Sequence, residues 1–162
     1  MQASSYGRSS GLRITVTVII ALILSKLPLP DFVREARPDL LLLLVIYWSL
    51  SSPRNFGLMF AWVCGLAVDV LSGTILGQHA VAFLVVAFLT HRFQLRMRVF
   101  PIYHQTLTVF MLLALYEFVV FWIDGIIGPA ITTWMRWLPV FTSALLWPLL
   151  VTVLDTWNRG RR

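Results

Sequence analysis

The stretch GLMFAWVCGLAVDVLSG, residues 57–73, decides the fold because it places an acidic residue inside a long apolar run. Small residues and this acid recur at every fourth position of the run, at Gly57, Ala61, Gly65, Asp69 and Gly73. A spacing of four aligns side chains along one ridge of an α-helix. Small residues on such a ridge let another backbone approach closely, as happens between membrane helices. The stretch therefore predicts a tightly packed membrane helix over residues 56–72.

The ridge admits two interpretations. It can pack against another helix of the same chain, or it can receive a helix of another protein. Asp69 lies near the outer end of this predicted span, where an acid is costly unless it faces the interior, water or a partner. Its carboxylate could be satisfied by the turn at residues 72–74, or by Gln78 or His79 on the next span.

The composition of the whole chain indicates an integral membrane protein. Hydrophobic residues make up 59% of the 162 residues, charged residues only 12%, and the mean hydropathy is +0.82. Soluble domains are about half apolar and about a quarter charged, and a chain this short cannot bury so much apolar surface by itself. Disordered chains are poor in apolar residues, so disorder is excluded. Cys64 is the only cysteine, which excludes a disulfide scaffold.

Further apolar segments flank the deciding stretch and complete a prediction of six membrane-spanning helices. A crossing needs roughly 20 mostly apolar residues, and fewer where polar flanks reach the interface. The predicted spans are residues 12–29, 39–52, 56–72, 76–91, 103–124 and 138–156. Arg8 and Arg13 at the start of the first span resemble the basic region of a signal peptide, but no small-residue cleavage site follows the span, so we expect it to be retained. We therefore expect one all-α polytopic membrane domain over residues 1–162.

The basic residues predict that both termini face the cytoplasm. Six crossings bring the two ends to the same side of the membrane. With both ends inside, nine arginines flank the inner ends of the spans, and only Lys26, Arg34, Arg37 and Arg136 lie outside. This bias follows the positive-inside rule. If residues 39–52 formed a re-entrant segment, five crossings would separate the termini and scatter the charge pattern.

The net charge of +6 has the same explanation. A strongly basic protein can bind nucleic acid. Here, however, the arginines sit at the inner edges of the spans, where they orient the chain and contact anionic lipid. We therefore expect membrane lipid, and no nucleic acid, as the partner of this charge.

Glu117 and Asp124 are candidates for a buried acidic site. They are seven residues apart on one predicted helix and share a face of it. Glu117 lies about two turns deeper, and an acid inside the membrane is a functional candidate by default. A structural or interface role is the alternative. Arg13 and Lys26 lie near the two ends of the first span, and the sequence offers no obvious Lys or Arg within the six spans as a partner for Glu117.

The titratable residues form no recognisable catalytic or metal-binding set. Asp69 and Asp124 lack the YD and GxGD contexts of intramembrane aspartyl proteases. His79, His91 and His104 are single residues without the spacing of metal ligands. The sequence contains no G-x-S-x-G, glycine-rich phosphate loop or HExxH motif. We expect neither an enzyme, nor a cofactor, nor a metal site.

The segment 124–137 is a candidate docking surface on the outer side. It holds Trp134, Arg136 and Trp137 next to one another. Such a segment can lie flat on the membrane interface, and it can equally receive a partner protein.

Two motifs point to a family. Arg37-Pro38-Asp39 leads into a leucine-rich span that ends at Tyr47-Trp48, and Gly57 is followed by Gly65-Leu66, by Asp69-Val70-Leu71-Ser72-Gly73 and by Leu76-Gly77. Together with the size, the six predicted spans and the basic tail, this pattern resembles the MreD family of bacterial rod shape-determining membrane proteins. The likeness covers residues 12–157.

The resemblance implies a multi-pass inner-membrane protein of the cell-elongation machinery, the elongasome, without enzymatic activity. It implies pairing with the bitopic protein MreC and, through it, with the RodA glycosyltransferase, a class B penicillin-binding protein and the actin-like MreB. It also implies a fold similar to the S-component of energy-coupling-factor (ECF) transporters. Our hypothesis is a scaffold or regulator that binds MreC and supports peptidoglycan synthesis and rod shape. The alternative is a small-molecule-binding S-component-like transporter subunit, with an outer pocket walled by Glu117, Trp122 and residues 124–137.

Overall fold

The apolar segments of the sequence form α-helices in the computed structural model, which describes residues 5–25, 37–51, 57–128 and 134–159. Across these residues it contains α-helices, one short 3-10 helix and no strand. The elements in chain order are α1 (Ser5–Leu24), α3 (Leu40–Ser51), α4 (Leu58–Ser72), α5 (Gln78–Val99), α6 (Ile102–Ile127), η1 (Trp134–Trp137) and α7 (Leu138–Arg159). The prediction of an all-α protein is confirmed.

Each α-helix falls on one of the predicted spans; α6 and α7 pass the predicted bounds by at most three residues, and α1 and α5 by seven or more. α1 begins at Ser5, seven residues before the predicted start, and α5 continues to Val99 instead of ending at residue 91. The basic segment after residue 91 is rich in Arg, Leu, Met and Gln, which favour helix. α5 stops before Pro101, because the residue that precedes a proline is disfavoured in the helical conformation and Phe100 is extended.

The helices differ in their capacity to cross a membrane. Among the described residues, three segments are long and apolar enough to cross a membrane: Gln78–Met97, Ile102–Ile127 and Trp134–Trp157. Ile14–Leu24, Leu40–Ser51 and Leu58–Ser72 are apolar but shorter. At 1.5 Å per residue, the 12 residues of α3 extend about 18 Å, against a hydrocarbon core of about 30 Å. Six crossings and cytoplasmic termini therefore stay predictions.

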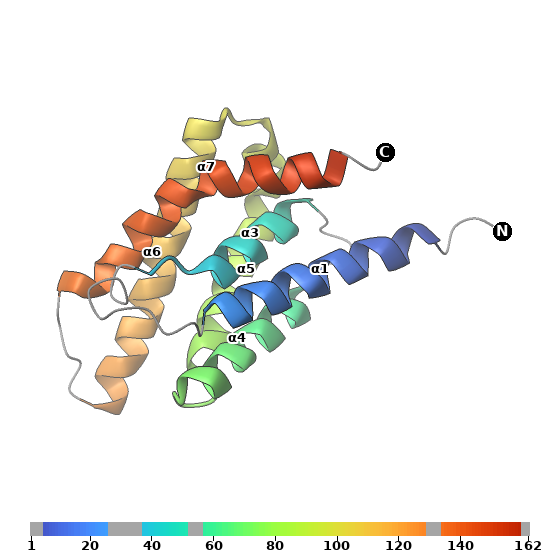
Figure 1. Cartoon of the computed structure of the whole chain (residues 1–162). Coiled ribbons are helices and arrows are strands. Elements are labelled where there is room, and N and C mark those ends of the chain that lie inside the picture. The colour runs from blue at the N-terminus through green and yellow to red at the C-terminus, as the bar shows by residue number, and fades with distance from the viewer. Residues whose placement is uncertain (1–4, 26–36, 52–56, 129–133, 160–162) are drawn as a thin grey trace.

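α3 is the central helix of the bundle. Every side chain from Leu41 to Leu50 is buried. A helix that is hydrophobic on all sides belongs inside a bundle, and α3 packs against α1, α5 and α7. Figure 1 shows α3 lying between α1 and α7. α3 is thus a short helix that protein, and not lipid, surrounds.

Helices that follow one another in the chain from α4 onward also pack on one another. α4 lies against α5, α5 against α6, and α6 against α7. Figure 1 shows that the start of α1 and the end of α7 lie on the same side of the molecule. An even number of crossings would produce this arrangement.

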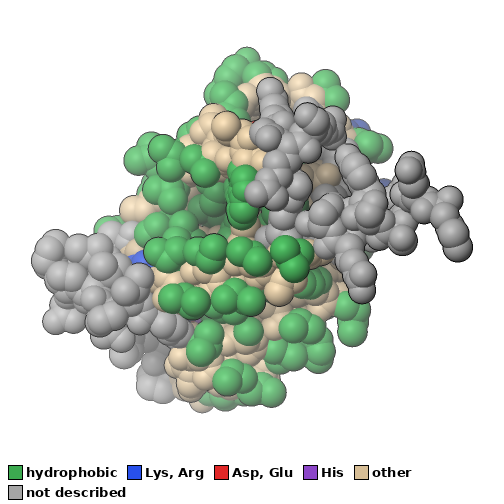
Figure 2. All heavy atoms as spheres, turned by 45° about the vertical axis from the view of Figure 1, so that its right-hand side comes forward, with side chains coloured by type: hydrophobic (Ala, Val, Ile, Leu, Met, Phe, Trp, Pro, Cys, Tyr) green, Lys and Arg blue, Asp and Glu red, His purple; other side chains and the backbone are tan. Residues whose placement is uncertain are grey.

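The surface of the bundle is largely apolar. Exposed hydrophobic side chains include Leu12 and Ile23 of α1, Met59 and Val70 of α4, and Leu145 of α7. On the face seen in Figure 2, hydrophobic side chains cover much of the described surface and charged ones are few. So much exposed apolar surface is foreign to soluble monomers and suits contact with lipid.

Candidate functional site

Asp69 is enclosed by hydrogen-bond donors at the junction of α4 and α5. Its side chain is completely buried. Oδ2 accepts the backbone N–H of Gly77 at 2.8 Å and that of Ala80 at 3.4 Å. Oδ1 accepts the backbone N–H of His79 at 2.9 Å and the Thr74 hydroxyl at 3.1 Å. The carboxylate thus satisfies the orphan donors at the start of α5, as acids do at helix N-termini.

Two glycines shape the turn that brings these donors to Asp69. Gly73 ends α4 in the left-handed conformation, with φ +67°, and its N–H donates to the Asp69 carbonyl. Gly77 precedes α5 with φ +106°. Both values lie where residues with a Cβ are strained. Gly77 can therefore turn its N–H toward the carboxylate at the position where a helix-capping side chain would otherwise act.

His79 contributes its ring as well as its backbone. Nδ1 lies 2.8 Å from Asp69 Oδ1 and 3.3 Å from the Thr74 hydroxyl. An ionised carboxylate only accepts hydrogen bonds, so the contact assigns the proton to Nδ1. The expected role of Asp69 at the turn and helix ends agrees with this geometry, and of the two side chains considered as partners His79 is the one that bonds to it.

A second group of polar contacts ties α5, α6 and η1 together. Gln78 of α5 donates from Nε2 to Asp124 Oδ1 of α6. Arg136 of η1 donates from Nη2 to Asp124 Oδ2 and from Nε to Glu117 Oε1. One guanidinium thus bridges the two acids that were predicted to share a helix face. The basic partner of Glu117 is thus Arg136, which comes from the short helix before α7 and not from one of the predicted spans.

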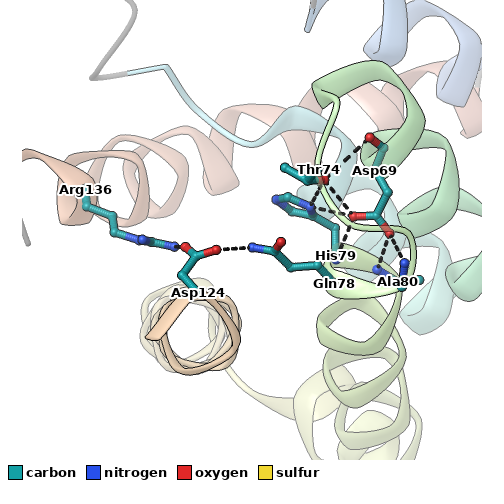
Figure 3. A network of polar contacts seen from close by, with 8 residues as sticks. Asp69, Thr74, Gln78, His79, Ala80, Asp124 and Arg136 are labelled. Atoms are coloured by element: carbon teal, nitrogen blue, oxygen red, sulfur yellow. Dashed lines mark hydrogen bonds and ion pairs between the residues drawn. The ribbon is translucent and has the colours of Figure 1, made fainter. Parts of the chain in front are cut away.

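The two groups form one layer at one end of the bundle. Gln78 and His79 are neighbours in the chain, so the contacts of Asp124 and those of Asp69 meet at the start of α5. Figure 3 shows the row that runs from Arg136 through Asp124 and Gln78 toward Asp69. We call these residues the polar layer: Asp69, Thr74, Gln78, His79, Glu117, Asp124 and Arg136.

Chemically, the polar layer fixes helix ends. Asp69 is surrounded by five donor contacts, and Glu117 and Asp124 share a cation, so each acid is engaged by its neighbours. Within the described ranges, no group of three His, Cys, Asp or Glu residues could hold a metal ion. The layer joins the ends of α4, α5 and α6 to η1. Outside the layer, the backbone N–H of Asp39, just before α3, donates to the Ser143 hydroxyl of α7 at 2.8 Å and ties these two helices together.

The structure divides the predicted ridge of α4 into two parts. Ala61 and Gly65 are buried, and a Cβ added at Gly65 would lie 2.4 Å from the Ala80 Cα of α5. Gly57 and Gly73 lie at the helix ends, and a Cβ added to either would meet nothing within 4 Å. The buried part of the ridge is therefore occupied by α5 of the same chain. Docking of another protein's helix on this ridge stays a prediction. α5 already covers the part of the ridge that holds Gly65.

The candidate docking residues lie at the same end as the polar layer. Trp134 is 90% exposed and Trp137 is partly buried against the core. Arg136 lies between them in η1 and points to the acids of α6. Of the predicted walls of a transporter-subunit pocket, Glu117 is paired with Arg136 and Trp122 is 65% exposed. Residues 129–133 of the third wall lie outside the described residues, so this pocket stays a prediction.

Sequence reasoning missed three of these contacts. The pairing of Glu117 with Arg136 joins residues 19 apart through a connection, and helical periodicity says nothing about such pairs. The Gln78–Asp124 contact joins two different helices. Tyr47, at the end of α3, donates to Asp155 of α7 at 2.7 Å. The one available signal was the shared face of the two acids, which suits a single bidentate cation.

Comparisons with known proteins place the chain in a family. The family model described as rod shape-determining protein MreD matches residues 9–156. The rod shape-determining protein MreD of Haemophilus influenzae (strain ATCC 51907 / DSM 11121 / KW20 / Rd) is 27% identical over 130 residues, which are 80% of each chain. No solved structure matches the chain, so the expected likeness to the ECF S-component stays a prediction. The family match spans nearly the whole chain, including all seven residues of the polar layer, and the chain belongs to the MreD family of rod shape-determining proteins.

Proposed function

We propose that this chain is a non-enzymatic scaffold of the bacterial inner membrane that binds MreC. Through MreC it acts with RodA, a class B penicillin-binding protein and MreB to support peptidoglycan synthesis and rod shape. Membership of the MreD family supports the role in shape determination. The apolar surface and the long apolar helices support a place in the membrane.

The observation that carries the proposal is the fixed position of η1. Arg136 is held by two acids of α6, while its neighbours Trp134 and Met135 are 90% and 50% exposed. An aromatic side chain on a fixed backbone loses little conformational freedom when a partner covers it. Tryptophan and arginine are also the residues that most often dominate binding energy at interfaces. η1 therefore suits a protein-docking surface at this end of the bundle.

We prefer η1 to the ridge of α4 as the docking surface because the ridge already packs against α5. A partner helix needs small residues that are free to be approached. Gly65 is already within contact of the α5 backbone. A bitopic partner also presents chain outside the membrane, on the side where the charge pattern of the sequence predicts that η1 lies. We therefore assign the MreC contact to η1, with Trp134 at its start.

The test is a matched pair of tryptophan substitutions in the full-length protein. Trp134→Ala removes the exposed ring of η1, and Trp157→Ala removes a ring that is 46% exposed near the other end of α7. We expect Trp134→Ala to weaken recovery of MreC from native membranes by about tenfold or more, as for interface tryptophans. The variant should also fail to restore rod shape in cells that lack the protein, whereas Trp157→Ala should behave as wild type.

The outcomes separate the hypotheses. If Trp134→Ala inserts normally and still recovers MreC at the wild-type level, η1 is not the docking surface. If the wild-type chain recovers an ATPase module with a bound small molecule, and no MreC, the scaffold proposal is wrong and a transporter subunit takes its place.

A further inference from the structure

A cavity of about 180 Å³ lies beside the polar layer, between the ends of the helices. Residues of five helices contribute to its wall, and the segment before α3 adds Arg37, Pro38 and Asp39. Leu42, Val68 and Phe83 are among the apolar side chains that line it. The polar side chains of Asp39, His79 and Tyr116 line it too. An apolar wall with a few converging polar groups is the usual make-up of a small-molecule site.

His79 lines this cavity, and its ring keeps one acceptor nitrogen that Asp69 does not use. Its Nδ1–H is engaged by Asp69, which itself receives four further donors. In the neutral ring with the proton on Nδ1, Nε2 is an acceptor. Nε2 has no hydrogen-bond partner among the residues that the structure describes. The buried carboxylate thus holds the ring in one tautomer, as second-shell carboxylates do for functional histidines.

Tyr116 and Asp39 add two further groups. Tyr116 is 6% exposed, and its hydroxyl makes no hydrogen bond to the described part of the chain. Its ring lies edge-on to Phe83 at 5.6 Å and 6.2 Å from the His79 ring, which fixes its position in the wall. The carboxylate of Asp39 likewise accepts no hydrogen bond from a described residue. Both residues line the cavity, so their oxygens are available to a molecule bound there.

The size of the cavity limits its occupant. An apolar cavity of about 150 Å³ in a well-studied protein holds one benzene molecule. The present cavity is slightly larger and carries acceptors on its wall. A single ring or an equivalent branched body therefore fits, with room for one donor group.

We propose that this cavity binds a small molecule with a compact apolar body and one amine or hydroxyl donor. The donor would bond to His79 Nε2, the Tyr116 hydroxyl or the Asp39 carboxylate, while Leu42, Val68 and Phe83 contact the body. This site is separate from η1 and does not depend on the assembly of a complex. The positive charge of Arg37 at the wall disfavours a ligand that carries another positive group besides its one amine.

The test measures binding to the full-length protein in lipid nanodiscs. Benzyl alcohol, benzylamine and toluene share one ring and differ in the donor they carry. We expect saturable binding of benzyl alcohol and benzylamine above the partition into empty nanodiscs, by titration calorimetry. Toluene should bind about tenfold more weakly, because it leaves the polar wall without a partner.

Two valine substitutions on α4 locate the binding. Val68→Phe fills the cavity, whereas Val70→Phe adds the same volume where the side chain is 67% exposed. We expect Val68→Phe to lower the affinity for benzyl alcohol by about tenfold or more, and Val70→Phe to change it by less than about twofold. Tyr116→Phe keeps the shape and removes the hydroxyl, so it tests the polar wall without filling the site. We expect it to weaken benzyl alcohol binding by about threefold to tenfold.

Three results would overturn the proposal. The first is that neither donor-bearing probe saturates the wild-type protein. The second is that toluene binds as tightly as benzyl alcohol, since the polar wall would then contribute nothing. The third is that both Val68→Phe and Tyr116→Phe, with wild-type unfolding midpoints, keep wild-type affinity, since binding would then lie elsewhere.

Discussion

Replacement of Gly65 by alanine should separate α4 from α5. The added Cβ would lie 2.4 Å from the Cα, 2.8 Å from the N of Ala80 and 2.9 Å from the carbonyl oxygen of His79. All three atoms belong to the backbone, so no side-chain rotation relieves the clash. Ordinary contact begins at about 3.4 Å. The two helices must therefore move apart by about 1 Å at this point.

The displacement should reach the Asp69 site, because Asp69 lies one turn beyond Gly65 on the same face. Its bonds to the His79 and Ala80 N–H groups are 2.9 Å and 3.4 Å long. A shift of about 1 Å along these bonds would take both past the normal hydrogen-bond range. Overpacking costs about 1–3 kcal/mol, and each weakened bond to the carboxylate adds about 1 kcal/mol or more. The gain in helix propensity offsets up to about 1 kcal/mol, so we expect a net loss of about 2–4 kcal/mol.

The assay is the free energy of unfolding of the purified protein, from titration of mixed micelles with sodium dodecyl sulfate. Gly125→Ala is the matched control, since Gly125 lies within α6 and a Cβ there meets nothing within 4 Å. We expect this control to be neutral or slightly stabilising. If Gly65→Ala proves as stable as the Gly125→Ala variant, the close contact between α4 and α5 does not exist as described.

Two further predictions concern the polar layer and use the same titration. Thr74→Val removes the hydroxyl that donates to Asp69 and should cost about 1–2 kcal/mol; Thr142→Val, whose hydroxyl bonds only to carbonyls of its own helix, should cost clearly less, and equal losses would contradict the role of Thr74. Arg136→Met leaves two acids without their cation and should cost about 2 kcal/mol, less than a fully buried pair because Asp124 is 30% exposed. Adding Glu117→Gln to that variant should restore part of the loss, and a further loss would contradict the ion pair.

The helices could be predicted from the sequence because apolar runs and proline positions act locally. All six segments that were predicted as spans contain a helix. The far end of α5 could not be predicted from hydropathy, since residues 92–99 are partly charged and helical at once. The central place of α3 also lay beyond prediction. Its composition indicates burial, but lipid and protein neighbours give a helix the same apolar sequence.

The polar layer was predictable only where its contacts are close in sequence. The turn between α4 and α5 joins Asp69 to His79 across ten residues, and the left-handed glycines between them mark a tight connection. The contact of Arg136 with Glu117 depends on how the segment after α6 returns to the bundle. That path is set by tertiary packing and not by a local pattern. The cavity, likewise, exists only once five helices are placed together.

The position of the ridge and that of the acid on α4 have a common cause. Asp69 can accept the backbone N–H groups at the start of α5 only if the two helix backbones nearly touch. Gly65 permits that approach, because any side chain there would strike Ala80. The glycine thus lets the acid reach α5, and the acid compensates the donors that the approach would bury unpaired. A substitution at either position should therefore disturb the other, and the Gly65→Ala and Asp69→Asn changes should be less than additive when combined.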